Sequence, residues 1–423
     1  MSELRPYLEY KASGDEWIGA IPAAWEVCAV GRYVRFRNGA DYSHVEVARE
    51  GYPVYGSGGE FRRASTFLFE GESVLFGRKG TVDRPLHVSG RFWTVDTMYF
   101  TEISRKHLNP RFVYYWATQI PYSYFKTSTA VPSMNQTDLA AAKIPIIPIG
   151  EQESIVRFLD RETAEIDAFI ADQEELIALL AERRAATIAH TITRGLNPSV
   201  PMKDSGVPRI GVIPTNWEIT RIAASIASVK NGTWGADPGG AYDLRCVRVA
   251  DFDRASQSVH DRNITFREVR PSERVGRLLM RGDLLLEKSG GGENSPVGFV
   301  VLFDSDEPAV TSNFVARIKL KEGMDPRFWN YVHGSNYRSR LTVRSIKQST
   351  GIQNLDHVNY FNEAAALPPY SEQVAIANYL DRETAELDAA IADAREAIAL
   401  SKERRAALIS AAVAGKIDVR GAA

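Results

Sequence analysis

The sequence predicts an α+β protein with two globular domains of duplicated origin, each followed by a long helix. Residues 151–190 match residues 372–411 at a constant offset of 221, with about 25 of 40 positions identical, which indicates an internal repeat. A second match lies upstream at an offset of 192, where Trp25 corresponds to Trp217. Between these matches the two copies have diverged, and both contain short β-rich runs broken by glycine turns. Each repeat therefore consists of a start motif, a variable stretch and a helix.

The repeated helical segments carry an apolar stripe with coiled-coil spacing. The apolar positions are separated mostly by four and seven residues, and they are Ile155, Leu159, Ile166, Ile170, Ile177 and Leu180 in the first copy and Ile376, Leu380, Leu387, Ile391 and Ile398 in the second. One amphipathic rod cannot bury its stripe alone, so we expect the two helices to pack as an antiparallel coiled coil. Gly195 and Gly415 are expected to end them. The pair is either a structural spacer, a docking surface for partner subunits, or both.

The predicted order along the chain is domain, helix, domain, helix. The boundaries are residues 1–150 for the first globular domain, 151–200 for the first long helix and linker, 201–371 for the second domain, and 372–423 for the second helix and tail. Residues 109–119 and 325–334 are expected to form a short helix in each domain. Two domains with one fold but different variable sequences indicate that both perform the same kind of task, each on a different target.

Composition and charge exclude several classes of protein. The 423 residues are 44% hydrophobic and 25% charged, which is ordinary for a soluble globular chain. The net charge is −2, yet residues 1–150 carry 17 − 15 = +2 and residues 201–371 carry 22 − 19 = +3, a mild excess that permits nucleic-acid binding without establishing it. Cys28 and Cys246 lack metal or disulfide spacing, which favours a reducing cytoplasm. No apolar run approaches the ~20 residues that span a bilayer.

Candidate DNA contacts in the first domain lie on glycine-bounded turns and in a polar loop. Arginine suits guanine edges, lysine suits phosphates, and hydroxyl and amide side chains suit base edges. The turn at residues 77–82, the segment after residues 56–59 and the loop at residues 128–135 give Arg62, Arg63, Arg78, Lys79, Thr81, Ser133 and Asn135. Each segment can also be interpreted as having no role in DNA contact, either as a solvated hairpin tip or as a linker.

The second domain offers a corresponding set of candidates. Its basic and polar segments include the loop at residues 349–356, which precedes the second long helix as the loop at 128–135 precedes the first. The candidates are Lys230, Asn231, Trp234, Lys288, Ser289, Arg344, Lys347, Gln348, Gln353 and Asn354.

No catalytic constellation is predicted. The phosphate-binding pattern GxxxxGK[ST] is absent, and the seven histidines are scattered without a metal or triad pattern. Residues 367–370 read Leu-Pro-Pro-Tyr, which resembles the adenine-holding motif of amino-methyltransferases. Leu367 cannot accept a hydrogen bond from the adenine amino group, so a turn before the helix is the better interpretation. A self-sufficient DNA methyltransferase is thereby disfavoured, and no metal or cofactor site is expected in this chain.

The start motif IPxxW, the GSGG and GRKG turns, the EQxxI helix starts and the doubled helix together resemble a specificity (S) subunit of a Type I restriction-modification system. The resemblance covers nearly the whole chain. It implies a non-catalytic cytoplasmic subunit in which each target-recognition domain reads one half of a bipartite, asymmetric site in double-stranded DNA. It also implies that the helices fix the gap and dock two methyltransferase (M) subunits, which restriction/translocase (R) subunits join.

The same resemblance assigns AdoMet, ATP and magnesium to the partner subunits and none of them to this chain. It implies weak DNA binding by the free subunit, because the partners supply much of the phosphate-neutralising surface. The alternative is an orphan DNA-binding regulator or a coiled-coil scaffold without restriction partners.

Overall fold

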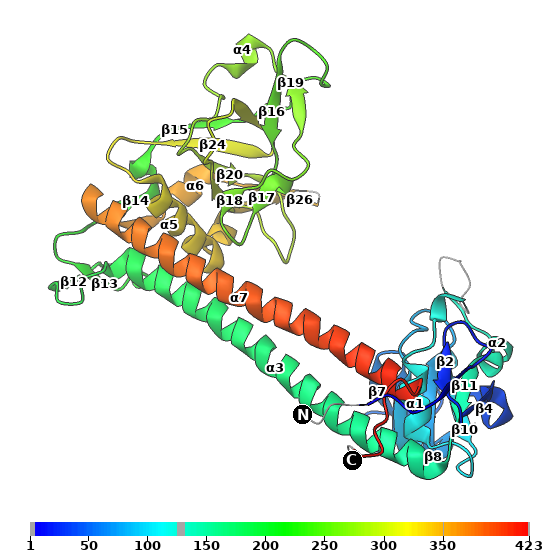
Figure 1. The fold of residues 1–423 in the computed structure, drawn as a ribbon. Coiled ribbons are helices and arrows are strands. Elements are labelled where there is room, and N and C mark those ends of the chain that lie inside the picture. Colours follow the sequence, from blue (N-terminus) through cyan, green and yellow to red (C-terminus); the bar gives the residue numbers. More distant parts are fainter. Residues whose placement is uncertain (1–4, 125–131, 350, 422–423) are drawn as a thin grey trace. The chain divides into compact units, whose positions relative to one another are not determined.

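The computed structural model describes residues 5–124, 132–349 and 351–421, and the chain divides into two compact units (Figure 1). The first unit comprises residues 1–175 and 394–423, and the second comprises residues 176–393. Two long helices, α3 (Ile149–Arg194) and α7 (Tyr370–Val413), each contribute residues to both units. Among the described helices, none combines the length and the apolar character that crossing a membrane requires.

A mixed sheet of seven strands forms the centre of the first unit. In spatial order its strands are β4 (Val34–Asn38), β10 (Met98–Ile103), β8 (Phe69–Gly77), β9 (Leu86–Thr94), β6 (Tyr52–Gly56), β7 (Gly59–Ala64) and β5 (Glu46–Val47). Neighbouring strands are antiparallel except β6 and β9, which are parallel. Two small antiparallel pairs accompany this sheet: β1 (Tyr10–Ala12) with β2 (Ala20–Pro22), and β3 (Glu26–Ala29) with β11 (Lys143–Ile146).

Short helices complete the first unit, and one was predicted from the sequence. Helix α1 (Pro110–Ala117) begins after Asn109, whose side chain accepts hydrogen bonds from the first-turn backbone N–H groups. Its Phe112 and Trp116 are buried in one core with Val74 of β8. Helix α2 (Gln136–Ala141) and the 3-10 turns η1 (Val30–Arg32) and η2 (Tyr122–Tyr124) are the other short elements described in this unit. The expected helix at residues 109–119 is therefore confirmed.

The second unit is built from smaller sheets. A six-stranded sheet has the order β15 (Ile226–Asn231), β24 (Val315–Leu320), β20 (Leu284–Glu287), β22 (Val300–Leu302), β18 (Ser258–Val259) and β17 (Phe252–Asp253). Two three-stranded sheets follow: β19 (Phe266–Glu268), β16 (Asp243–Val247) and β23 (Ala309–Thr311), and β21 (Ser289–Gly290), β26 (Ile352–Leu355) and β25 (Ile346–Ser349). The remaining strands pair as β12 (Met202–Asp204) with β13 (Val212–Pro214), and β14 (Glu218–Arg221) with β27 (Ala364–Leu367).

Helices of the second unit include the other short helix expected from the sequence. This is α5 (Pro326–Arg338), which begins after Asp325 as α1 begins after Asn109. Figure 1 shows α5 beside the first half of α7. The other short elements described are α4 (Pro271–Arg274), α6 (His357–Phe361), η3 (Ile222–Ser225), η4 (Val249–Asp251) and η5 (Leu341–Ser345). The prediction for residues 325–334 is confirmed, and the helix extends four residues further.

The two long helices bury much of the predicted apolar stripe. Its residues with at most 9% exposure are Ile155, Leu159, Ile166, Ile376, Leu380, Leu387, Ile391 and Ile398. In the first unit, Leu159 of α3 shares a core with Ile409 of α7. In the second unit, Ile188 of α3 shares a core with Leu380 of α7. Both helices end before the predicted glycines, which adopt left-handed backbone angles: Gly195 (φ +73°) and Gly415 (φ +68°).

Residues that recur in the sequence make the same contacts in each unit. A buried tryptophan from the start motif donates to a glutamate at the beginning of the long helix, and a tyrosine donates to an aspartate about two turns further on. These contacts are Trp25–Glu151 (3.2 Å) with Trp217–Glu372 (2.8 Å), and Tyr115–Asp160 (2.6 Å) with Tyr331–Asp381 (2.8 Å). The residues repeated in the sequence thus hold the start of each long helix against its own unit through the same hydrogen bonds.

Lowering the pH is expected to destabilise the second unit through His333. This residue of α5 is fully buried, its Nδ1 lies 2.8 Å from the Tyr360 hydroxyl, and burial lowers its pKa from 6.5 to about 4. Between those values the unfolded chain binds a proton that the folded chain excludes, so stability falls with falling pH, by about 2 kcal/mol between pH 7 and 5. Urea unfolding of His333→Gln should lack this loss. The exposed His190→Gln is the matched control and should retain it.

Candidate nucleic-acid interface

In the first unit, the structure joins two predicted DNA-contact segments that are distant in sequence. The loop after β8 pairs with the segment before α2: Lys79 lies opposite Ser133 in a β-bridge, and the Met134 N–H donates to the Arg78 carbonyl at 3.0 Å. The Gly80 N–H donates to the carbonyl of Pro132 at 2.9 Å. One surface therefore carries the cationic turn and the polar segment together.

The side chains of this surface differ in their exposure and in the interactions they already make, and therefore in their availability to a ligand. Lys79 and Thr81 are exposed, and within the described residues the Lys79 ammonium forms no ion pair. Arg78 is half-buried, and its Nη1 donates to the Asp96 carbonyl at 3.3 Å. Asn135 caps α2 by accepting from the Asp138 N–H at 2.8 Å. Lys79 is thus the more available cation. Residues 128–131 of the predicted polar loop lie outside the described residues.

Arg62 and Arg63 do not join this surface through any described contact. Both lie on β7, where Arg62 pairs with Glu46 at 3.0 Å and Arg63 pairs with Glu60 at 2.7 Å. Their positive charge is compensated locally by neighbouring carboxylates. They remain predicted contacts, with less net charge to offer a phosphate than Lys79 has.

In the second unit, six predicted residues lie on one three-stranded sheet or at its edge. Strand β21 follows Lys288 directly, and in the register of the sheet Asn354 lies opposite both Ser289 and Lys347. Gln353 lies opposite Gln348 in the neighbouring strand pair. The Ser289 Oγ lies 2.7 Å from the Asn354 Oδ1, and Lys288 accepts a backbone hydrogen bond from the Leu355 N–H at 2.8 Å. Hydroxyl, amide and ammonium groups are therefore gathered on one sheet.

The charges on this sheet are only partly compensated. Lys347 is 77% exposed and pairs with Asp356 at 2.7 Å, and the hydrogen bond from the Lys347 ammonium lowers the pKa of that carboxyl. Such an exposed pair opens easily for a phosphate. Within the described part of the chain, Lys288 forms no ion pair. Burial raises the pKa of the adjacent Glu287 carboxyl, which pairs with Arg254.

The two units thus share one construction. A cation-bearing turn leaves a buried strand, β8 or β20, and is hydrogen-bonded through its backbone to the polar segment before a short helix, α2 or α6. That short helix is capped by the side chain of Asn135 in the first unit and Asp356 in the second. The arrangement places cations, of which Lys79 and Lys347 are exposed, next to hydrogen-bonding side chains, which is the chemistry needed to hold a phosphate backbone and read base edges.

The remaining predicted residues of the second unit lie elsewhere. Lys230 and Asn231 end β15, and Lys230 is exposed. Trp234 follows them and is 41% exposed, with the Arg267 guanidinium 4.6 Å from its ring centre. Arg344 is exposed in η5.

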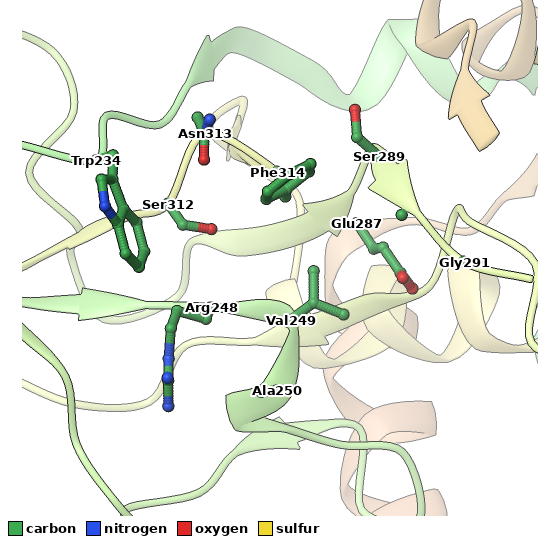
Figure 2. A pocket seen from close by; sticks show the side chains of 11 residues that line it. Trp234, Arg248, Val249, Ala250, Glu287, Ser289, Gly291, Ser312, Asn313 and Phe314 are labelled. Carbon is green, nitrogen blue, oxygen red and sulfur yellow. The ribbon is translucent and has the colours of Figure 1, made fainter. Parts of the chain in front are cut away.

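A pocket beside β21 involves residues that the sequence did not indicate. Its lining includes Trp234 and Ser289, which were predicted, together with Asn313 and Phe314, which were not (Figure 2). Phe314 is 44% exposed, and its sequence context, an aromatic residue after Ser312 and Asn313, gives no signal of that exposure.

Replacing Gly77 by alanine should displace the cationic turn of the first unit. A Cβ at this position would overlap the backbone of Thr81 and Val82, which cannot move without shifting the turn that carries Arg78 and Lys79. We expect a stability loss of at least about 1 kcal/mol in urea unfolding, with weakened DNA binding. Gly58→Ala is the matched control, because its Cβ would meet no atom within 4 Å. Equal effects of the two variants would contradict the steric argument.

Comparison with known proteins shows what this chain is similar to. Residues 23–177 match the family model of the Type I restriction modification DNA specificity domain. The MjaVIII specificity subunit of Methanocaldococcus jannaschii, a type I restriction enzyme subunit, is 21% identical over 389 residues, covering 85% of this chain and 86% of that protein. The StySPI specificity subunit of Salmonella potsdam is 20% identical over 284 residues, covering 66% of this chain and 59% of that protein.

A solved structure shares the fold. It is a chain from a structural study of complex assembly and conformational transition of the type I R-M system, with a TM-score of 0.68 and 14% identity, covering 93% of this chain and 98% of that chain. Residues 23–177 thus match the DNA specificity domain that the resemblance in the sequence implies. Over most of its length the chain is similar to type I restriction enzyme specificity subunits.

Proposed function

We propose that this chain is the DNA-recognition subunit of a Type I restriction-modification complex, in which each unit reads one half of a bipartite, asymmetric site. The observation that carries the proposal is the construction common to both units, a cationic turn hydrogen-bonded to a polar segment. Lys79 and Ser133 represent it in the first unit, and Lys288 and Asn354 in the second. The side chains around the two turns differ, which suits two half-sites of different sequence.

The long helices are proposed to form an antiparallel coiled coil that sets the distance between the half-sites. Arg405 pairs with Asp167 at 3.0 Å in the first unit, and Arg184 pairs with Asp388 at 3.0 Å in the second. A step of 17 residues along α3 (184 − 167) corresponds to an equal step back along α7 (405 − 388). One constant antiparallel register accounts for both pairs. The predicted domain boundaries, residues 1–150 and 201–371, stand as part of this proposal.

The helices are also proposed to dock methyltransferase subunits. Phe169, Leu176 and Leu179 on α3 are 44%, 40% and 56% exposed, and their spacing of seven and three residues places them on one face of the helix. Leu400 on α7 is 57% exposed. Large apolar side chains in such a row are typical of a protein interface. Two M subunits would occupy this surface, R subunits would join them, and catalysis with AdoMet, ATP and magnesium would belong to these partners in the cytoplasm.

The proposal is tested by mapping adenine methylation. Long-read sequencing would compare cells carrying this gene and its neighbouring methyltransferase gene with cells lacking this gene alone. We expect a bipartite motif to be methylated only when the gene is present, and a plasmid copy to restore it. Unchanged methylation in the deletion strain would overturn the proposal in favour of an orphan DNA-binding or scaffold protein.

A second measurement tests whether the partners contribute to affinity. The purified chain alone should bind DNA containing the mapped motif weakly, and addition of methyltransferase subunits should tighten binding. Tight, salt-insensitive binding by the free chain would contradict the division of the phosphate contacts between subunits.

A further inference from the structure

The second unit contains an open pocket with aromatic walls beside the cationic turn. Its volume is about 490 Å³, within the range of about 300–1,000 Å³ typical of small-molecule sites. Trp234 and Phe314 line it and remain 41% and 44% exposed, although large aromatic side chains are normally buried (Figure 2). Two exposed rings at one pocket present flat apolar surface for another ring to stack upon.

A buried hydroxyl group between these rings has no hydrogen-bond partner among the described residues. Ser312 is 2% exposed, and within the described residues its Oγ forms no hydrogen bond. Figure 2 shows its side chain between those of Trp234 and Phe314. The backbone of Ser312 is fully engaged, because its N–H donates to Val247 and its carbonyl accepts from Val315. The hydroxyl therefore remains as a donor and acceptor for a polar atom inside the pocket.

The pocket walls are held in place by the protein itself. The Arg267 guanidinium stacks on Trp234 and pairs with Asp237 at 2.7 Å. Arg248, another lining residue, is held by Asp251 at 2.7 Å. A site whose walls are fixed before binding loses little conformational entropy when the ligand arrives.

Gly291 lines the pocket close to the cationic turn. Gly291 has a φ of +59°, and a Cβ there would lie 2.7 Å from the Val297 nitrogen. The Glu287 carboxylate at the pocket is neutralised by Arg254 at 2.7 Å. The Glu287 side chain therefore presents no unpaired negative charge to a ligand in the pocket.

We propose that this pocket receives an unstacked nucleobase of the bound DNA. The rings of Trp234 and Phe314 suit the face of a base, and the Ser312 hydroxyl suits a polar atom on its edge. The Lys288 N–H donates to the Phe314 carbonyl at 2.9 Å, so the pocket wall is joined to the turn assigned to DNA contact. The inference rests on the proposed function and extends it, because the second unit would then displace a base as well as read its edge.

The experiment uses the complex with methyltransferase subunits and duplexes carrying the mapped motif. The fluorescent base 2-aminopurine is placed singly at each position in and beside the second half-site. We expect fluorescence to rise at one position besides the methylated adenine, which the methyltransferase itself extrudes. Phe314→Ala and Trp234→Ala should abolish that rise and weaken binding about 5- to 150-fold, the range expected for lost base stacking.

Three controls separate a specific loss of the pocket from a general loss of the complex. The rise at the methylated adenine should persist in both variants, since it reports an intact complex. Phe266→Ala, which removes a ring that is 50% exposed and does not line the pocket, should behave as wild type. Phe314→Tyr should retain the rise because it keeps the stacking face, whereas Phe314→Leu should lose it.

Results that contradict the assignment of the pocket can be told apart from results that contradict the proposed function. Motif binding and methylation without a second fluorescent position, or with a rise that survives Phe314→Ala, would overturn the pocket assignment alone. Absence of motif-specific binding would remove the proposed function and this inference with it. Saturable binding of free deoxyadenosine or thymidine monophosphate that Phe314→Ala abolishes, with no base displaced in the duplex, would assign the pocket to a free nucleotide and overturn the proposal.

Discussion

Replacing Gln152 by methionine is expected to lower the stability of the first unit by about 3–6 kcal/mol. The Gln152 side chain is fully buried at the start of α3, where its Oε1 accepts from the Asn109 N–H at 2.7 Å. Its Nε2 donates to the carbonyls of His107 and Ile147 at 2.8 and 2.9 Å. Methionine preserves the volume and leaves these three backbone groups unpaired. Calorimetry should show the melting temperature of this unit fall by roughly 10 °C.

The neighbouring position supplies the control. Glu153→Met introduces the same side chain at an exposed site in the same turn and should be nearly neutral. Gln373 accepts from Asp325 at 3.0 Å and donates to Pro368 at 2.9 Å, so Gln373→Met should destabilise the second unit instead. Similar losses in Gln152→Met and Glu153→Met would show that the hydrogen bonds do not carry the effect.

The elements that the sequence predicted are those decided by local pattern. The apolar stripe of residues 151–190 and its copy predicted both long helices, because a spacing of four and seven residues defines one helix face. The glycines at 195 and 415 marked their ends, since left-handed backbone angles favour glycine. The Asn-Pro and Asp-Pro pairs at 109–110 and 325–326 stand at the starts of α1 and α5.

The sites depended on pairing between distant segments, which local pattern does not encode. Lys79 and Ser133 are 54 residues apart (133 − 79), and Ser289 and Asn354 are 65 apart (354 − 289), yet each pair lies in one backbone ladder. Residue type alone made them candidates. Only the tertiary fold brings them together, because strand pairing is selected by burial and cross-strand packing over the whole unit.

Residue type does not show how charges are compensated or which aromatic side chains are exposed. Arg62 and Arg63 have the composition of a phosphate site, but Glu46 and Glu60 lie beside them in the fold. Phe314 would ordinarily be assigned to a core, and its exposure is visible only once strands β23 and β24 place it at the pocket. Charge compensation and exposure are properties of neighbours in space, so a single sequence specifies them poorly.

Removing two cations from the candidate surface of one unit should impair recognition of one half-site only. Arg78→Ala with Lys79→Ala removes them in the first unit, and Lys288→Ala with Lys347→Ala removes a matched pair in the second. Each pair should weaken binding of the complex to its motif by roughly 100-fold, at about 1–3 kcal/mol per contact. If both cations contact phosphates, the slope of log affinity against log salt should fall by about 2.

The half-site assignment is measured by methylation mapping of each variant. The first pair should relax sequence preference in one half of the motif and leave the other half unchanged, and the second pair should do the reverse, because each turn belongs to a separate unit. Exposed cations outside these turns serve as matched controls: Arg105 with Lys106 in the first unit, and Lys319 with Lys321 in the second. Relaxation of both halves by either pair would contradict modular reading, since it would mean that the two units recognise one shared sequence.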